Sequence, residues 1–362
     1  MLRSIYIKNY RSLKTLQIAS LGNVNLITGK NNTGKSSLLE AIGIYASKAN
    51  VSFIYQLLKD KGEIRNYTIN DEDNPEPIIQ AISSLFTDRV IEYEQNNSIE
   101  IGEIENTLFG ERLSLTQCVS LRFAKELDES PKGYEFSRVV LAISVQNEAS
   151  SSFSRRIEAR FFSILGKGLG ETDQYQNLQY INTRNIDRDI NAKLWDSIAL
   201  TDKENDVIEA LKIIEPLAER IAFLGNNNNQ RSPVLKLSGN KQLVPLKSMG
   251  DGINRILTII LALVSADKGV LLIDEFENGL HHSVQAKLWE IIFSLSKKLQ
   301  VQVFVTTHSN DCIAGFEQIL NQENNQLNGR LIRLENKNGL IKQVEFNANE
   351  LRIATENDIE IR

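Results

Sequence analysis

The chain contains 362 residues, of which 41% are hydrophobic and 24% charged, and its formal net charge is −5. This composition is typical of a globular protein and argues against one that coats nucleic acid with its whole surface, although a local basic patch stays open. Because the longest apolar run, 256–264, is shorter than the roughly 20 residues of a membrane span, and neither a signal peptide nor a cysteine framework is evident, we expect a cytoplasmic protein.

The N-terminal residues predict strands, a loop and a helix in that order. Apolar and polar residues alternate over 2–7 and 13–18, which predicts two antiparallel strands. A third short strand at 24–27 leads into a glycine-rich turn at 29–34. Helical spacing of apolar residues begins at Lys35, so the turn is expected at the amino end of a helix.

The middle of the chain carries weaker signals. Acidic residues and prolines predict a loop at 70–77. Strands are expected at 114–123 and 136–145, where β-branched and aromatic residues gather. Residues 191–224 show helical periodicity, and we expect the tract of four asparagines at 226–229 to form the loop that ends this helical region.

The C-terminal part alternates between helices and strands. Helices are expected at 252–266 and 282–299, and each is followed by a short apolar strand, at 270–273 and 301–305. Such alternation predicts a parallel sheet. A hairpin with an Asn-Gly turn is expected within 331–346.

The turn at 29–36 matches the phosphate-loop pattern GxxxxGK[ST] between a predicted strand and a predicted helix. Gly29 and Gly34 allow backbone angles and a close approach that a Cβ would obstruct. Lys35 supplies a positive charge to the phosphates of ATP, and the Ser36 hydroxyl completes the coordination of Mg²⁺. The residues predicted to bind the nucleotide here are Gly29, Lys30, Asn31, Asn32, Thr33, Gly34, Lys35, Ser36 and Ser37.

Two carboxylates follow the apolar strand 270–273. In an open α/β sheet, ligands bind at the carboxyl ends of the strands, which is where these side chains fall. We expect Asp274 to hold Mg²⁺ through water, and Glu275 to polarise the water that attacks the γ-phosphate. The sequence therefore predicts a catalytic pair beside the phosphate loop.

The segment 246–252, Leu-Lys-Ser-Met-Gly-Asp-Gly, directly precedes a predicted helix. It resembles the signature motif of ABC-type ATPases, in the Ser-x-Gly-x-Gly variant of the OLD, RecF and SMC group. The resemblance implies an α/β fold, a P-loop NTPase of the ABC-ATPase head type with an antiparallel β subdomain and a short helical subdomain, whose lobes we place at 1–180 and 181–362. It also implies a homodimer in which each signature segment contacts the ATP held by the other copy, through Ser248, Gly250 and Gly252. A hydroxyl and glycines at a helix N-terminus suit an anion.

Two further segments resemble the same group. Residues 277–281 follow the paired acids where these ATPases place their D-loop, and 305–309 contains His308 where they place the switch histidine. His308 is one of only three histidines, and the resemblance implies that its imidazole bonds the γ-phosphate and reports its loss. The glutamine of the Q-loop is not identifiable in this sequence.

The resemblance also narrows the function. The sequence has no sustained heptad repeats, so it does not predict the long coiled coil of SMC relatives. We also expect that the residues after His308 are too few for a Toprim nuclease domain. The form of the chain, including 180–184, resembles the stand-alone OLD-like ATPases of bacterial anti-phage systems, such as the ATPase of PARIS systems. This implies an ATPase that dimerises around ATP and controls a separately encoded effector, expected to be a Toprim-type nuclease.

Two alternatives stay open. A RecF-like ATPase of DNA repair would bind DNA through a local basic patch, for which Arg155, Arg156 and Arg160 would share one face if 152–165 is helical. Arg184 and Arg188 follow this segment, and an ordinary solvated face explains all five arginines as well. An ATPase subunit of a transporter is disfavoured, because the chain has no Leu-Ser-Gly-Gly-Gln.

Overall fold

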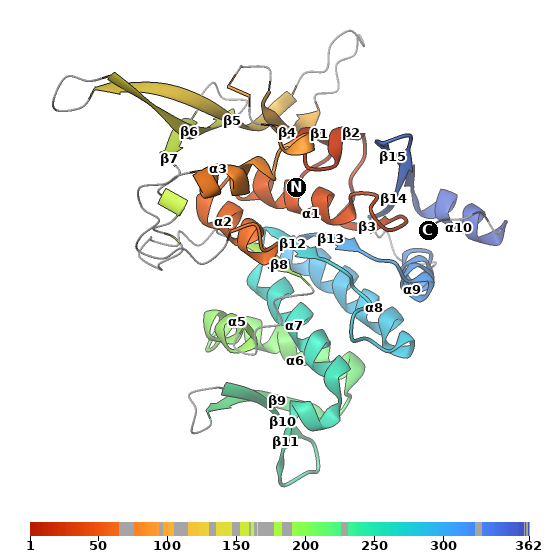
Figure 1. Cartoon of the computed structure of the whole chain (residues 1–362). Coiled ribbons are helices and arrows are strands. Elements are labelled where there is room, and N and C mark those ends of the chain that lie inside the picture. Colours follow the sequence, from red (N-terminus) through yellow and green to blue (C-terminus); the bar gives the residue numbers. More distant parts are fainter. Residues whose placement is uncertain are drawn as a thin grey trace.

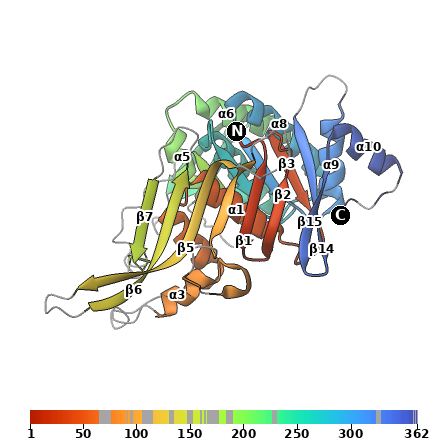
Figure 2. The same ribbon diagram turned by 90° about the horizontal axis from the view of Figure 1, so that it is seen from above.

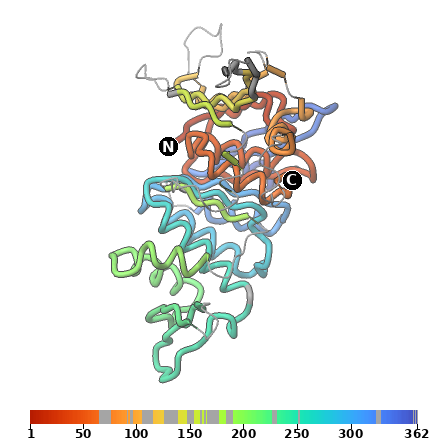
Figure 3. The backbone as a smooth tube through the Cα atoms, turned by 60° about the vertical axis from the view of Figure 1, so that its left-hand side comes forward, coloured from red at the N-terminus to blue at the C-terminus, as the bar shows by residue number. Residues whose placement is uncertain are grey.

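The computed structural model describes residues 1–64, 76–90, 92–93, 97–104, 115–129, 135–146, 153–158, 161–162, 165, 177–182, 190–225, 231–322, 328–357, 359 and 361. The molecule is elongated, with the N-terminal elements near one end and residues 218–225 and 231–245 at the other (Figure 3). Among the described residues, no helix combines the length and the apolar composition that crossing a bilayer needs.

A mixed six-stranded sheet lies at the centre of the molecule. Its parallel part confirms the sheet that the alternation of helices and strands predicts, and it takes strands from both sides of residue 180. In sheet order the strands are β15 (Leu340–Phe346), β14 (Gly329–Lys337), β3 (Val24–Thr28), β13 (Gln302–Thr306), β12 (Val270–Ile273) and β8 (Leu178–Ile181). Only β15 runs antiparallel to its neighbour.

The central sheet is covered on both faces, because successive side chains of its strands enter two different cores. Leu272 and Phe304 join the core that holds α1 (Lys35–Ala46) and α2 (Val51–Asp60). Their neighbours Leu271 and Val303 join the second core. The helices of that core include α6 (Lys203–Ile214), α7 (Asp251–Ser265), α8 (His282–Leu299) and α9 (Asn310–Leu320), on the other side of the sheet (Figure 1).

A second six-stranded sheet, entirely antiparallel, covers α1 on the side away from the central sheet (Figures 1 and 2). It confirms the predicted N-terminal strands, and β5 and β6 are longer than expected because they pair with each other from Cys118↔Gln146 to Glu129↔Glu135. In sheet order its strands are β2 (Leu13–Ile18), β1 (Ile5–Tyr10), β4 (Ile99–Ile104), β5 (Leu115–Glu129), β6 (Glu135–Gln146) and β7 (Phe153–Glu158).

The helical region expected over 191–224 is only partly correct. It holds α5 (Ile190–Ile198) and α6, but Ala218–Gly225 is a strand, β9. Pro216 explains the end of α6, because the residue before a proline avoids helical angles, and Glu215 is extended. The prediction failed because the buried residues of β9, Ala218 and Ile221, are three apart, as they would be in a helix.

Strand β9 begins a small antiparallel sheet with β10 (Arg231–Leu237) and β11 (Leu243–Pro245), which leads directly into the signature segment 246–252. Pairing across the sheet, for example Ile221 opposite Leu235, therefore overrides the local helical spacing of β9. The asparagine tract 226–229 lies outside the described residues.

The helix considered for 152–165 is wrong over 153–158, whereas the other described residues of this range, 161, 162 and 165, are helical. Residues 153–158 form β7, in which Arg155 and Arg156 are successive and so point to opposite faces of the sheet. The other arginines of this group, at 160, 184 and 188, lie outside the described residues. Of the predicted loop 70–77, only its last two residues are described, and they begin α3 (Glu76–Ser83).

The C-terminal predictions are confirmed. Helix α7, strand β12 and helix α8 match the expected ranges to within one residue. The hairpin of β14 and β15 turns at Asn338 (φ 55°) and Gly339 (φ 81°), the left-handed pair that an Asn-Gly turn requires. After it, α10 (Ala348–Glu356) packs against β14, β15 and α9.

Candidate active site

The phosphate loop joins β3 to α1, and its two glycines are required by both angle and space. Gly29 has φ 138°, and a Cβ there would lie 2.4 Å from the carbonyl oxygen of Leu334. Gly34 has φ 85°, and a Cβ there would lie 2.8 Å from Cδ1 of Ile341. A Cβ at Gly29 would overlap the backbone of β14, whereas one at Gly34 would have to displace the end of the Ile341 side chain.

The side chain of Lys35 is buried within the phosphate loop. Lys35 is 6% exposed, and its ammonium donates to the carbonyl oxygens of Gly29 at 2.6 Å and Lys30 at 2.9 Å. The hydroxyl of Thr33 donates to the same Lys30 carbonyl at 2.8 Å. Helix α1 begins behind Gly34, which has no side chain to cap it, so the first amide groups of α1 are suited to an anion in the loop.

Three oxygen-bearing side chains meet at the carboxyl ends of β12 and β13. The Asp274 carboxylate accepts from the hydroxyl of Ser36 at 3.1 Å and from that of Thr306 at 2.6 Å. Asp274 is 9% exposed and Thr306 is buried. Hydroxyl and carboxylate oxygens this close to the phosphate loop suit Mg²⁺, which prefers oxygen ligands and keeps phosphates and water as the others.

Glu275 occupies an unusual backbone conformation directly after Asp274. Its φ is 50°, a left-handed angle that costs a residue with a side chain about 1 kcal/mol or more. Its amide donates to the hydroxyl of Thr306 at 2.9 Å, which fixes the turn from the neighbouring strand. A strained, half-buried carboxylate held next to a candidate metal site is suited to activate water.

The loops after β12 and β13 are joined by Glu277. Its carboxylate accepts from the backbone amide of His308 and from the hydroxyl of Thr307, both at 2.7 Å. The segment 277–281 therefore holds the backbone of the expected switch histidine in place. His308 itself is half-buried at the same edge of the sheet as Asp274.

The signature segment presents an open surface. The hydroxyl of Ser248 is exposed and donates to the carbonyl of Pro245 at 2.7 Å. Gly250 has φ 104° with no atom within 4 Å of where a Cβ would stand, whereas a Cβ on Gly252 would lie 3.3 Å from the carbonyl oxygen of Gly279. The short helix 246–249 packs against α7, β10 and β11, and Figure 1 shows β10 and β11 at one end of the molecule, on the other side of the central sheet from α1.

Four residues of this region were not found from the sequence. Thr306 was not recognised because it lies at the end of a predicted strand. The pair of threonines directly before His308 could have pointed to a site at this strand end. Asn182, which donates to Asp60 at 2.7 Å, follows β8 at the same sheet edge as Asp274. Glu277 lay inside a predicted segment without a role, and Arg255 of α7 carried no signal at all.

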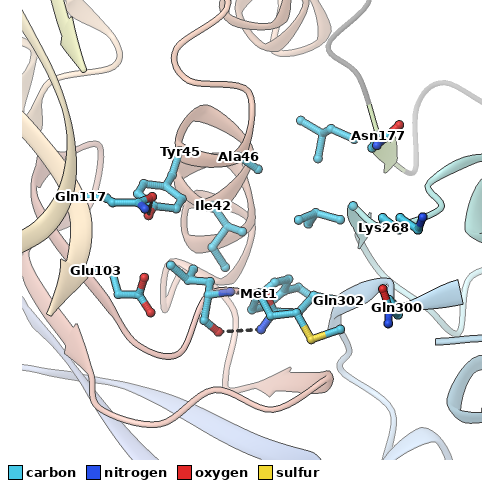
Figure 4. A pocket seen from close by; sticks show the side chains of 15 residues that line it. Met1, Ile42, Tyr45, Ala46, Glu103, Gln117, Asn177, Lys268, Gln300 and Gln302 are labelled. Atoms are coloured by element: carbon cyan, nitrogen blue, oxygen red, sulfur yellow. Dashed lines mark hydrogen bonds between the residues drawn. The ribbon is translucent and has the colours of Figure 1, made fainter. Parts of the chain in front are cut away.

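The structure also contains a cavity of about 350 Å³ away from these residues. It lies beside the amino ends of β8, β12 and β13 and the end of α1, where Figure 4 shows Tyr45, Asn177, Lys268 and Gln302 around it. The phosphate loop and the paired acids lie at the carboxyl ends of the parallel strands. The cavity is therefore separate from the candidate active site.

Comparisons with known proteins find chains that are similar to this one. The chain is 24% identical over 345 residues to an "ATP/GTP phosphatase" of Helicobacter pylori, covering 89% of each protein. An uncharacterized protein of Methanocaldococcus jannaschii is 41% identical over 61 residues, which cover 17% of this chain and 28% of that protein. A solved structure of an Smc head bound to the C-winged helix domain of ScpA aligns with a TM-score of 0.50 at 14% identity, covering 98% of this chain and 99% of that one.

The structural likeness confirms the expected fold class, a P-loop fold of the ABC-ATPase head type. A family model described as "AAA domain, putative AbiEii toxin, Type IV TA system" matches residues 24–313. Because this match covers most of the chain and includes the phosphate loop, the paired acids and the histidine segment, the protein belongs to this family of AAA domains and is an ATPase.

Proposed function

We propose that this ATPase closes as a cytoplasmic homodimer around two ATP molecules, and that the closed state controls a separately encoded effector, a Toprim-type nuclease, in anti-phage defence as an OLD-like ATPase. One observation carries the proposal. The signature segment exposes Ser248 and the open Gly250 at its surface, and the short helix that carries Ser248 packs against α7, β10 and β11. A second copy is the partner that would use this surface.

The phosphate loop and the paired acids form the first half of each site. Lys35 and the amides at the start of α1 would hold the β and γ phosphates, and Ser36 and Asp274 would hold Mg²⁺. The ion neutralises phosphate charge and orients the phosphate oxygens when bound. Glu275 accepts the proton of the attacking water, and His308, tied to Glu277, lies beside the γ-phosphate.

The signature segment forms the second half. Gly250 begins α7 with an unobstructed backbone, so a phosphate from another molecule can approach its amide groups. Gly252 lies against Gly279 of the 277–281 segment, so the signature segment and the expected D-loop are neighbours within one copy. A two-fold dimer would bring each signature segment to the other copy's phosphate loop, which gives two equivalent sites.

The role in defence rests on the family. Its description names a putative toxin of a type IV toxin-antitoxin system. The Helicobacter pylori relative is described as a phosphatase of ATP and GTP, which supports nucleotide turnover as the driving reaction. A tagged pull-down with the products of neighbouring genes tests the effector, and an ATP-dependent nuclease among them is the expected result.

The composite site is tested by mixing two inactive variants. Lys35→Ala removes the phosphate lysine, and Ser248→Arg blocks the signature segment, so each homodimer has no intact site. In a mixed dimer, one site combines the intact loop of one copy with the intact signature of the other. Each mixed dimer has one good site of two, so roughly a quarter of the wild-type rate should return if copies pair at random, and about half if only mixed dimers close around ATP.

The control mixture pairs Lys35→Ala with a chain that carries both substitutions, which cannot form an intact site. It should stay inactive at every ratio. If the first mixture stays inactive as well while both variants are folded, or if Ser248→Arg alone keeps the wild-type rate, the site is not shared between copies and the proposal fails.

A further inference from the structure

Arg255 is a buried arginine on α7, about one and a half turns after Gly250. It is 3% exposed, and its Nη2 lies 3.3 Å from the carbonyl oxygen of Asp274 and 3.5 Å from that of Glu275. The helix that begins at the signature segment thus reaches the backbone of both paired acids. The strained turn at Glu275 is held by Thr306 at its amide and by Arg255 at its carbonyl.

The guanidinium is incompletely satisfied in this state. Its Nε and Nη1 are buried and have no hydrogen-bond partner among the described residues. Burial lowers the pKa of Arg255, and the carboxylates of Asp274, Glu275 and Glu277 oppose that shift. Burying a cation with unused donors costs free energy.

We propose that Arg255 is a positioning residue that couples the signature segment to the turn carrying Glu275 in the same copy. The inference rests on the proposed dimer. When the partner's nucleotide docks on the signature segment, α7 shifts as a rigid body, and Arg255 moves with it. Its guanidinium group then binds a carboxylate of the loop that carries Asp274 and Glu275, and this contact positions Glu275 for catalysis. Hydrolysis therefore requires closure of the dimer.

Two contacts extend the same coupling. Gly252 lies against the carbonyl of Gly279, so the start of α7 also moves with the 277–281 segment. Glu277 of that segment holds the amide of His308. A small displacement at the signature segment therefore reaches both Glu275 and the loop of His308 through packed, hydrogen-bonded neighbours.

The test compares Arg255→Lys and Arg255→Ala with the wild-type protein. Lysine keeps the charge and most of the packing but lacks the planar fork, so that variant should fold normally. ATP affinity should stay unchanged, because the phosphate loop is untouched. Since a displacement of about 1 Å costs ~10²-fold in rate, we expect kcat to fall roughly 10-fold in Arg255→Lys and 10²-fold in Arg255→Ala.

The readout that separates coupling from simple support is the dependence of the rate per chain on protein concentration. In the wild type it should rise steeply as dimers form, whereas in Arg255→Lys the residual rate should depend on concentration much less. Arg330→Lys is the matched control, because Arg330 also has a buried Nε without a partner in the described chain but lies at the other edge of the sheet, opposite Asn25. It should behave as the wild type.

Three results would overturn the inference. A wild-type kcat and concentration dependence in Arg255→Lys would remove Arg255 from the coupling while leaving the dimer intact. An equal loss in Arg330→Lys would show that any buried arginine has the same effect. A wild-type rate per chain that is constant from nanomolar to micromolar protein would instead defeat the proposed dimer, on which the inference depends.

Discussion

The residues at the carboxyl ends of β12 and β13 act as one hydrogen-bonded unit. The hydroxyl of Thr306 contacts both the carboxylate of Asp274 and the amide of Glu275, and Glu277 joins the same turn to His308. Each contact fixes backbone as well as side chain. The left-handed angle of Glu275 persists because its neighbours hold the turn from both sides.

Glu275→Gln should separate binding from hydrolysis. Glutamine keeps the size of the side chain and the strained turn but cannot accept a proton, so we expect hydrolysis to slow ~10²–10⁴-fold. Phosphate release measures the rate, and equilibrium binding of a fluorescent ATP analogue should show unchanged affinity. Glu290→Gln on α8 is the control and should change neither the hydrolysis rate nor the affinity. Unchanged turnover in Glu275→Gln would remove Glu275 from the role of base.

The two cysteines should be unreactive in the folded protein. Burial raises the pKa of Cys118 to about 11, and it raises the pKa of Cys312 still further. Because a raised pKa disfavours the thiolate, only ~0.1% of Cys118 is reactive at pH 8, and the reaction should speed up about tenfold per pH unit up to that pKa. Titration with a disulfide reagent at pH 8 measures this. Rapid labelling of both thiols in the native state would contradict the burial.

At the scale of elements, α1 is held by a buried carboxylate as well as by apolar packing. Glu40 is fully buried and lies 2.7 Å from Nε of Arg11, 2.8 Å from the ammonium of Lys61 and 3.0 Å from the hydroxyl of Tyr10. These partners come from β1, its turn and the end of α2. These contacts connect α1, the helix that begins at the phosphate loop, to both β1 and α2.

Glu40→Ala should therefore destabilise the protein strongly. It leaves Arg11 buried without its carboxylate, and breaking a buried pair in this way costs about 3–5 kcal/mol of unfolding free energy. Urea denaturation measures the change. The control is Glu63→Ala, which breaks an exposed pair with Arg89 and should cost about 0–1 kcal/mol. Equal effects of the two substitutions would show that the Glu40 cluster adds no stability.

Local signals predicted most elements, and long-range pairing accounts for the failures. The glycine spacing of 29–34 and the apolar run before Asp274 are local, and both were placed correctly. Strand β9 was missed because its pairing with β10, rather than its own residue spacing, decides its structure. Arg255 could not be found from sequence, because its significance depends on which strand end α7 packs against.

At the scale of the whole molecule, two cores share one sheet. The phosphate loop lies between them, because β3 contributes residues to both, and the signature segment lies on the second core only. A closed dimer is then a contact between the first core of one copy and the second core of the other. Nucleotide and metal would bridge this contact, so dimerisation should depend on both.

The Glu275→Gln variant is the best reporter of this state, because it keeps ATP bound. With ATP and Mg²⁺ we expect its mass in solution to double from the 40.9 kDa of one chain. Chelating the metal should return it to monomer, since Ser36 and Asp274 would then face the phosphates without a cation between them. Adding Lys35→Ala should also keep it monomeric. Light scattering measures each mass, and a dimer that forms equally well without nucleotide would show that the copies meet through contacts unrelated to ATP.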